Sequence, residues 1–191
     1  LPIDRLVIAT NQNDILDRAM RSGSYVTDGV RPSISPSMDI QVSSNFERAL
    51  FDAYGRDGAA VTQLMAELKA GGFHISQGAL EMLRGTFASG RCSEEETVAT
   101  IKAQYAATGE VLCPHSAVGV KVAEDHLGDS PMITLATAHP AKFPDAVESA
   151  MGQRPALPQR MSDLFERAER VTRVPNDLEA LETLVRERIA H

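Results

Sequence analysis

The sequence contains no tryptophan, only two cysteines, and few aromatic residues of any kind, which make up 5% of 191 residues. So few aromatic side chains argue against a surface on which nucleic-acid bases stack. The charge balance agrees, because 26 acidic residues outnumber 19 basic ones and give a formal net charge of −7. An acidic chain is a poor general binder of DNA or RNA, so we expect no nucleic-acid partner.

The cysteine pattern and the hydropathy exclude further classes. Cys92 and Cys113 lie far apart, with no Cys-x-x-Cys pair, so we expect neither a disulfide framework nor a metal site. No apolar run approaches the roughly 18 to 20 residues of a membrane span, and no signal peptide is evident. We therefore expect no membrane partner, and a reducing, cytoplasmic setting is the simplest interpretation.

Hydrophobic residues make up 43% of the chain, which is enough to build a core. Two short apolar segments containing β-branched residues, 6–10 and 132–136, have the pattern of buried strands in a parallel sheet. Most of the remaining sequence has helical periodicity, so the fold class is α/β. Two parallel strands are too few for a complete doubly wound sheet, so we expect a helix-rich part of a larger α/β fold.

Helical patterns and their start and stop signals place the other elements. Ser93 and Glu96 form a capping box, and Asn13 is a plausible N-cap for the first helix. We expect a loop over 24–37 and a short strand or extended link over 73–75. The expected helices are 14–21, 44–55, 59–70, 78–89, 93–107, 114–127, 141–151, 161–171 and 176–190.

The chain begins with Leu1 rather than methionine, directly before a predicted buried strand. We therefore expect it to be a fragment of a longer protein, cut on its N-terminal side. Pro155 and Pro158 indicate a linker before two mixed-charge amphipathic helices at the C-terminal end.

Polar residues follow both predicted strands, and parallel sheets bind their ligands at the carboxyl ends of the strands. The first group contains Asn11 and Asn13, and the second contains Thr137, Ala138 and His139. The alternative is that these side chains only cap helices and satisfy strand ends, and spacing alone favours that alternative.

Two more candidates lie at the start of the helix expected from residue 114. His115 is more plausibly a packed or capping residue than a catalytic one, and Cys113 is more plausibly an inert buried thiol than a nucleophile.

Five stretches, in this order and over nearly the whole chain, carry a family resemblance. They are Ile8-Ala9-Thr10-Asn11-Gln12-Asn13-Asp14, Pro36-Ser37-Met38-Asp39-Ile40, Ser43-Ser44-Asn45-Phe46-Glu47-Arg48, Cys113-Pro114-His115-Ser116-Ala117-Val118-Gly119 and Thr137-Ala138-His139-Pro140-Ala141-Lys142-Phe143. Together they resemble threonine synthase, in its long bacterial and fungal form. The family uses pyridoxal 5′-phosphate (PLP) to convert O-phospho-L-homoserine and water to L-threonine and phosphate.

The resemblance implies a fold-type II PLP enzyme of which this chain is the C-terminal part. Residues 1–152 would then belong to the large cofactor-binding domain, and residues 153–191 would form a helical tail that packs on it. The family's Schiff-base lysine and its phosphate-binding loop lie upstream, so no catalytic residue is expected in this chain. The chain alone is expected to be inactive, with the N-terminal remainder of the enzyme as its partner.

The resemblance also implies roles for the two polar groups. Thr137 matches the position whose hydroxyl bonds the pyridine nitrogen of PLP, with Ala138 and His139 beside the ring. Asn11 and Asn13 would lie in the crevice near the phosphate loop. Cys113 departs from the family, which commonly has aspartate there. Two other functions stay open: a non-catalytic α/β interaction domain, and a related fold-type II PLP dehydratase.

Overall fold

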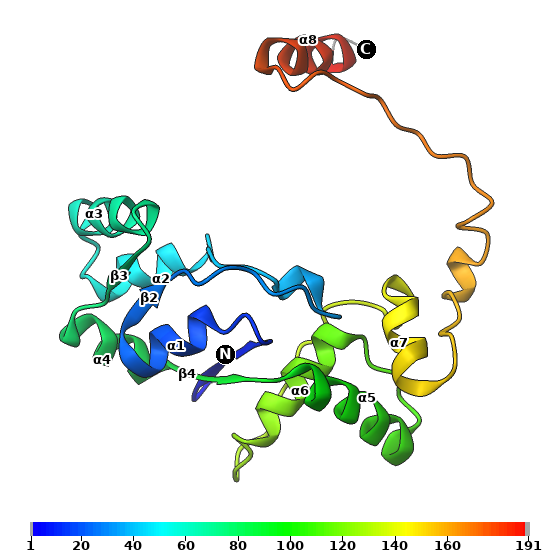
Figure 1. The fold of residues 1–191 in the computed structure, drawn as a ribbon, viewed down its shortest axis with the longest axis horizontal. Coiled ribbons are helices and arrows are strands. Elements are labelled where there is room, and N and C mark those ends of the chain that lie inside the picture. Colours follow the sequence, from blue (N-terminus) through cyan, green and yellow to red (C-terminus); the bar gives the residue numbers. More distant parts are fainter. Residues whose placement is uncertain (1, 190–191) are drawn as a thin grey trace. The chain divides into compact units, whose positions relative to one another are not determined.

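The computed structural model describes residues 2–189, and it divides into two compact units (Figure 1). The first unit runs to Ala156 and contains every strand of the described chain, and the second begins at Leu157. The packing of a 153–191 tail on the preceding residues stays a prediction.

The central sheet has two parallel strands, β1 (Leu6–Thr10) and β4 (Phe87–Arg91). Leu6 pairs with Phe87 at one end and Thr10 with Arg91 at the other. The prediction of β1 is confirmed, and so is the α/β class with a small parallel sheet.

β4 was predicted as the end of a helix, and this prediction is wrong. Helix α4 (Gln77–Thr86) ends and β4 begins at the next residue. The strand contains small residues because a helix packs closely on it: a Cβ on Gly90 would lie 2.8 Å from Cγ1 of Val122. A strand of small side chains lacks the β-branched pattern on which strand prediction depends.

The strand predicted over 132–136 is also wrong. The segment has no regular secondary structure and forms no ladder with any described strand. Ile133 and Leu135 are 81% and 75% exposed. The residue types suit a strand, but a strand also needs a neighbour for its backbone N–H and C=O groups.

Helices α1 (Ile15–Ser22) and α6 (Pro114–Glu124) cover opposite faces of the sheet. Side chains alternate along a strand, so Ile8 packs into the cluster beneath α1, whereas Val7 and Ala9 pack against Val118 and Val122 of α6. α6 ends at Glu124, three residues earlier than predicted.

A second small sheet lies beside α1, formed by β2 (Ser24–Val26) and β3 (Gly72–His74) paired antiparallel. β2 lies in the predicted loop over 24–37, so that prediction is wrong at its start. Tyr25 on β2 is almost fully buried and stacks on Phe46 and Phe73. Helices α2 (Phe46–Ala53), α3 (Gly58–Lys69) and α4 enclose this core (Figure 1).

Local signals fixed most helix ends. Ser93 and Glu96 make the predicted capping box at the start of α5 (Glu94–Thr108). α1 ends at Ser22, one residue after its predicted end, and Gly23 follows in the left-handed conformation; the N-cap of α1 is Asp14 rather than Asn13. The region predicted as one helix over 141–151 is a 3₁₀ turn, η2 (Pro140–Lys142), followed by α7 (Pro144–Met151).

The second unit contains a short 3₁₀ turn, η3 (Gln159–Met161), and helix α8 (Leu178–Ile189). α8 was predicted, but the helix predicted over 161–171 is replaced by turns and irregular chain. Within residues 2–189, every helix is too short or too polar to cross a membrane. Another turn, η1 (Pro36–Met38), belongs to the site described next.

Candidate functional site

The carboxyl end of β1 carries a buried polar network. Asn11 and Asn13 are almost completely buried, and Oδ1 of Asn11 accepts from both the backbone N–H and the side-chain amide of Asn13, at 2.8 and 3.2 Å. Asn13 in turn accepts from the N–H of Arg31 and donates to its carbonyl. The two asparagines therefore hold the loop of residues 31–39 in place rather than capping α1.

Asp39 lies at the centre of this network. Its carboxylate accepts from the side-chain amides of Asn11 and Asn13, each at 2.8 Å. It also accepts from the backbone N–H of Ser33 at 2.8 Å and from the Ser33 hydroxyl at 2.6 Å. Ser35 is fully buried and its hydroxyl accepts from Asn11 at 2.9 Å. One carboxylate thus satisfies donors from both the strand end and the loop.

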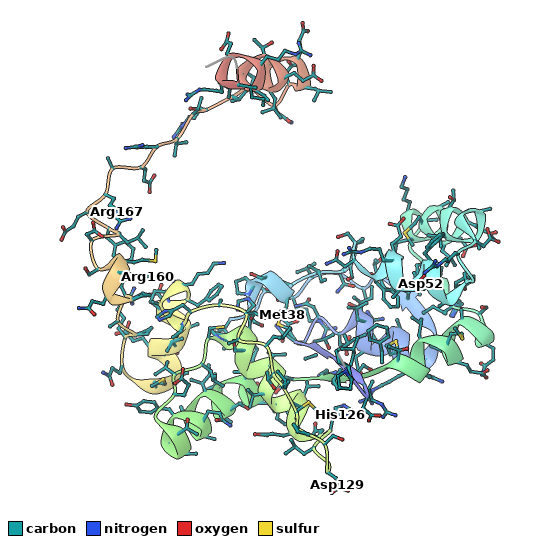
Figure 2. All side chains as sticks on the ribbon, turned by 180° about the vertical axis from the view of Figure 1, so that it is seen from behind. Met38, Asp52, His126, Asp129, Arg160 and Arg167 are labelled. Atoms are coloured by element: carbon teal, nitrogen blue, oxygen red, sulfur yellow. The ribbon has the colours of Figure 1, made fainter. Side chains whose placement is uncertain are left out.

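The loop of residues 31–39 also donates hydrogen bonds to side chains of two helices, α5 and α6. The N–H of Ile34 donates to Glu94 at 3.0 Å, and the N–H of Ser37 donates to Nε2 of His115 at 3.1 Å. Met38 packs on the cluster formed by the sheet and α6, and Figure 2 shows it beside that helix. The loop is therefore fixed over the end of β1.

His115 is buried at the start of α6. Burial is the main cause that lowers the pKa of its imidazole, and the nearby Lys142 ammonium lowers the pKa further, against a smaller opposing effect of Asp39. Because Nε2 accepts from Ser37, the proton of the neutral ring is assigned to Nδ1. Nδ1 is buried and has no hydrogen-bond partner within the described chain. The ring packs against Phe143, with centroids 4.4 Å apart.

Ser116, the next residue, makes the contact to the second polar group. Its hydroxyl accepts from the backbone N–H of Thr137 at 3.2 Å and lies 3.2 Å from Sγ of Cys113. Cys113 is buried and caps α6 by accepting from the N–H of Ser116 at 3.4 Å. The first turn of α6 therefore lies between the loop over β1 and the segment that carries Thr137.

The three residues of the second group are accessible. Thr137 and His139 are exposed and Ala138 is half-buried. Nδ1 of His139 accepts from the N–H of Ala141 and caps η2. The Thr137 hydroxyl makes no hydrogen bond to any residue from 2 to 189, so it is available to a ligand as a donor and as an acceptor.

The structure brings Asn11 and Asn13 into one network, and among the described residues His115 and Ser116, neighbours on α6, contact the loop of that network and Thr137 respectively. Reasoning from single strand ends did not identify Asp39, Ser33, Glu94 or Ser116. The available signal was that Asp39 and Ser116 lie in stretches that carry the family resemblance. No group of three or more His, Cys, Asp or Glu side chains in the described part of the chain is placed to hold a metal ion.

Comparisons with known proteins identify the family of this chain. The family description "Threonine synthase, C-terminal" matches residues 116–185, which include Ser116 and Thr137. Threonine synthase from Pseudomonas aeruginosa is 49% identical over 97% of this chain. The chain belongs to the threonine synthase family. The chain spans about 40% of the length of the P. aeruginosa relative.

Solved threonine synthase structures share the fold. PLP-bound threonine synthase from Brucella melitensis superposes with a TM-score of 0.90 at 53% identity, over 98% of this chain and 41% of that one. Yeast threonine synthase gives a TM-score of 0.82 at 37% identity, over all of this chain and 43% of that one. The predicted family and fold are therefore confirmed, and this chain corresponds to the C-terminal portion of its relatives.

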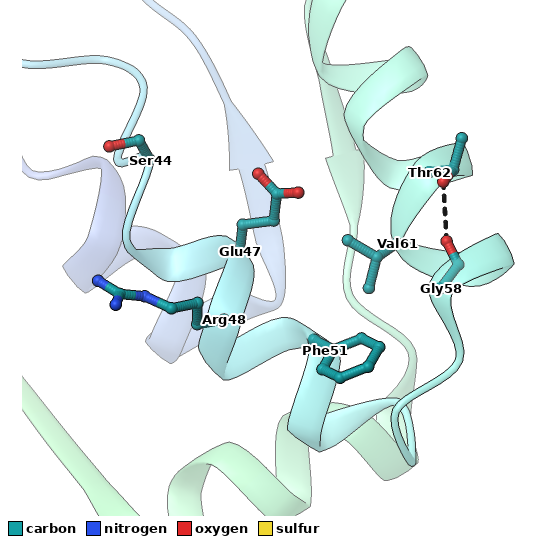
Figure 3. Close-up of a pocket in the computed structure, with 7 residues that line it drawn as sticks. All are labelled: Ser44, Glu47, Arg48, Phe51, Gly58, Val61 and Thr62. Carbon is teal, nitrogen blue, oxygen red and sulfur yellow. Dashed lines mark hydrogen bonds between the residues drawn. The ribbon is translucent and has the colours of Figure 1, made fainter.

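A separate groove of about 430 Å³ lies between α2 and α3 (Figure 3). It contains none of the five predicted cofactor-binding residues. Glu47 and Arg48 line it, and both are exposed, whereas Val61 is buried. Arg48 donates to the side chain of Asn45. With its charged side chains open to solvent, the groove has no enclosed polar contact to select a ligand.

Proposed function

We propose that this chain is the C-terminal part of an enzyme that converts O-phospho-L-homoserine and water to L-threonine and phosphate with PLP. The observation that carries the proposal is the 49% identity to P. aeruginosa threonine synthase, which extends over 97% of this chain. The PLP named for the B. melitensis structure supports the choice of cofactor. The free, buried Cys92 and Cys113 fit a reducing cytoplasm.

The chemistry of Thr137 fits the cofactor. Its exposed hydroxyl has no partner among residues 2–189, and a hydroxyl can donate to a neutral pyridine nitrogen without forcing its protonation. A carboxylate at that place would instead stabilise a protonated ring. When bound, PLP supplies an electron sink for carbanion chemistry. Thr137 would hold the ring nitrogen, with Ala138 and His139 beside the ring.

Asn11 and Asn13 have a different part in the proposal. Their amide groups already bond to Asp39, Arg31 and each other, so they would shape the crevice by holding the loop in place. Direct contact of either side chain with PLP stays a prediction.

The covalent lysine of the proposed reaction is assigned to the N-terminal remainder of the enzyme. Lys121 forms an ion pair with Asp125 at 2.9 Å, and the Lys142 ammonium lies 5.5 Å from the Phe143 ring centroid.

We propose that the N-terminal remainder also supplies a strand beside residues 132–136 and covers Ile133 and Leu135, since exposed apolar strand edges favour pairing. The chain alone would then be inactive.

The test is an assay of the full-length enzyme with PLP and O-phospho-L-homoserine, with L-threonine and phosphate measured separately. The proposal predicts equal amounts of both products, and none from residues 1–191 alone. Release of 2-oxobutyrate and ammonia from L-threonine, with no threonine formed, would favour the related dehydratase. If the full-length protein bound neither PLP nor substrate, a non-catalytic interaction domain would be the better account.

A further inference from the structure

Ser116 is a buried hydroxyl with a defined orientation. The residue is 3% exposed, and its Oγ lies 3.2 Å from the backbone nitrogen of Thr137 and 3.2 Å from Sγ of Cys113. A backbone N–H can only donate, so Ser116 is the acceptor for Thr137. The contact joins a rigid helix to an extended segment 21 residues away.

The segment that carries Thr137 has little else to fix it within this chain. Across residues 130–138, the bond to Ser116 is the one backbone hydrogen bond to any part of the described chain. Its second support on α6 is steric, because a Cβ on Gly119 would lie 3.0 Å from Cγ2 of Thr134. Within this chain, the backbone position of Thr137 therefore depends on the Ser116 hydroxyl, whereas the strand proposed above would pair with residues 132–136, which precede Thr137.

Helix α6, which carries Ser116, is itself held in place by packing and hydrogen bonds. α6 packs on β1 and β4 through Val118 and Val122, and His115 in the same turn accepts from Ser37 of the loop over β1. Ligand-binding groups need to be held within about 0.5 Å of their productive position by supporting hydrogen bonds, and a hydroxyl on a packed helix is suited to that role.

We propose that Ser116 is a positioning residue: by accepting from the Thr137 N–H, it fixes the place from which the Thr137 hydroxyl bonds the ring nitrogen of PLP. The proposal rests on the proposed function. Ser116 acts through Thr137 and makes no contact with the cofactor itself.

The test uses the full-length enzyme with Ser116→Ala and Ser116→Thr. Removing one neutral hydrogen bond should lower kcat by about threefold to tenfold and leave KM for O-phospho-L-homoserine nearly unchanged. Two readouts are independent of activity: the dissociation constant for PLP should rise, and amide hydrogen exchange in the peptide containing Thr137 should accelerate. Ser116→Thr retains the hydroxyl and should restore all three values.

A double-mutant cycle separates positioning from a general structural effect. In a Thr137→Val background, Ser116→Ala should cause no further loss of kcat or PLP affinity, because the hydroxyl that Ser116 places is already absent. The matched control is Ser89→Ala, which removes a serine bond to Asp17 of 2.7 Å and should leave kcat and PLP affinity unchanged. Equal losses for Ser89→Ala and Ser116→Ala would overturn the proposal.

Two other results would also overturn it. One is wild-type kcat, PLP affinity and hydrogen exchange in Ser116→Ala. The other is additive losses for Ser116→Ala and Thr137→Val. If Ser116→Ala does not fold, Ser116→Cys fills the site with a weaker acceptor and should shift each readout in the same direction. A wild-type enzyme without threonine synthase activity would instead contradict the proposed function, which keeps the two failures distinct.

Discussion

The backbone N–H of Ser37 donates to Nε2 of His115 across 3.1 Å, although the two residues are 78 positions apart. This bond joins the loop over β1 to the first turn of α6, and it requires an imidazole with an unprotonated Nε2. Protonation of His115 would replace the acceptor with a second donor facing the N–H group.

His115 should therefore make folding stability depend on pH. Its pKa in the folded chain is lowered from the usual 6.5, mainly by burial. Between the lowered value and 6.5 the unfolded chain binds more protons, so the free energy of unfolding should fall as the pH drops below about 6.5. Well above pH 6.5 His115 is neutral in both states and contributes no pH dependence.

Urea unfolding between pH 5 and 7.5 checks this prediction, with His115→Gln as the comparison. Glutamine does not titrate and can place an oxygen near the position of Nε2. The difference between the two proteins should shrink or change sign as the pH falls, while the other histidines cancel. Parallel pH profiles for wild type and His115→Gln would show that His115 does not carry the effect.

Gly90 should tolerate no side chain. A Cβ there would lie 2.8 Å from Cγ1 of Val122, which is 1% exposed and cannot turn away easily. Gly90→Ala should lower the free energy of unfolding by about 1 to 3 kcal/mol, as overpacked cores do. Adding Val122→Ala to Gly90→Ala should recover part of the loss.

The matched control for Gly90 is Gly85→Ala in α4, where an added Cβ meets no heavy atom within 4 Å. That change should be neutral or stabilising by up to about 1 kcal/mol, because alanine favours helix. Chemical denaturation of the variants gives the comparison. Equal stabilities for Gly90→Ala and Gly85→Ala would contradict the close packing of α6 on β4.

Asp39 should be the residue on which the loop most depends. Asp39→Asn keeps the shape but replaces one acceptor oxygen with a donor. If the amide oxygen stays toward the side chains of Asn11 and Asn13, the NH2 group faces the backbone N–H of Ser33, which then loses its acceptor. We expect a loss of about 1 to 3 kcal/mol in unfolding free energy and faster amide exchange over residues 31–39. Asp28→Asn, which alters an exposed ion pair of 3.9 Å, should change stability by less than about 0.5 kcal/mol. If amide exchange over residues 31–39 were the same in Asp39→Asn and the wild type, Asp39 would not be the residue that holds the loop.

The sequence patterns predicted elements whose signals are local. β1 is a run of β-branched and apolar residues, and α5 begins at the Ser93–Glu96 capping box and ends at Gly109 in the left-handed conformation, so both were predicted well. β4 could not be predicted in this way, because its small residues are explained by Val122, more than thirty positions away. The prediction of a strand over residues 132–136 was wrong for the opposite reason. Their composition suits a strand, but no described strand pairs with them.

The same distinction applies to the candidate site: local signals indicated its polar residues but not the contacts between them. The strand end after β1 correctly indicated Asn11 and Asn13 as a polar group, and the family resemblance indicated Thr137. The contacts that connect them could not be derived from periodicity. Asp39 accepts from the side-chain amides of Asn11 and Asn13, and His115 and Ser116 accept from backbone N–H groups far away in the sequence. A hydrogen bond to a distant backbone group leaves no periodic pattern in a single sequence.

The most direct measurement is steady-state kinetics of Thr137→Val, Thr137→Ser and Thr137→Asp in the full-length enzyme, together with the PLP content of each variant. Loss of a donor to a buried nitrogen costs about 1 to 3 kcal/mol, so Thr137→Val should reduce kcat by about tenfold to a hundredfold while PLP stays bound. Thr137→Ser should be nearly silent, and Thr137→Asp should be harmful because a carboxylate favours a protonated ring. If Thr137→Val matched the wild type in both turnover and PLP content, Thr137 would not be the residue that holds the cofactor nitrogen.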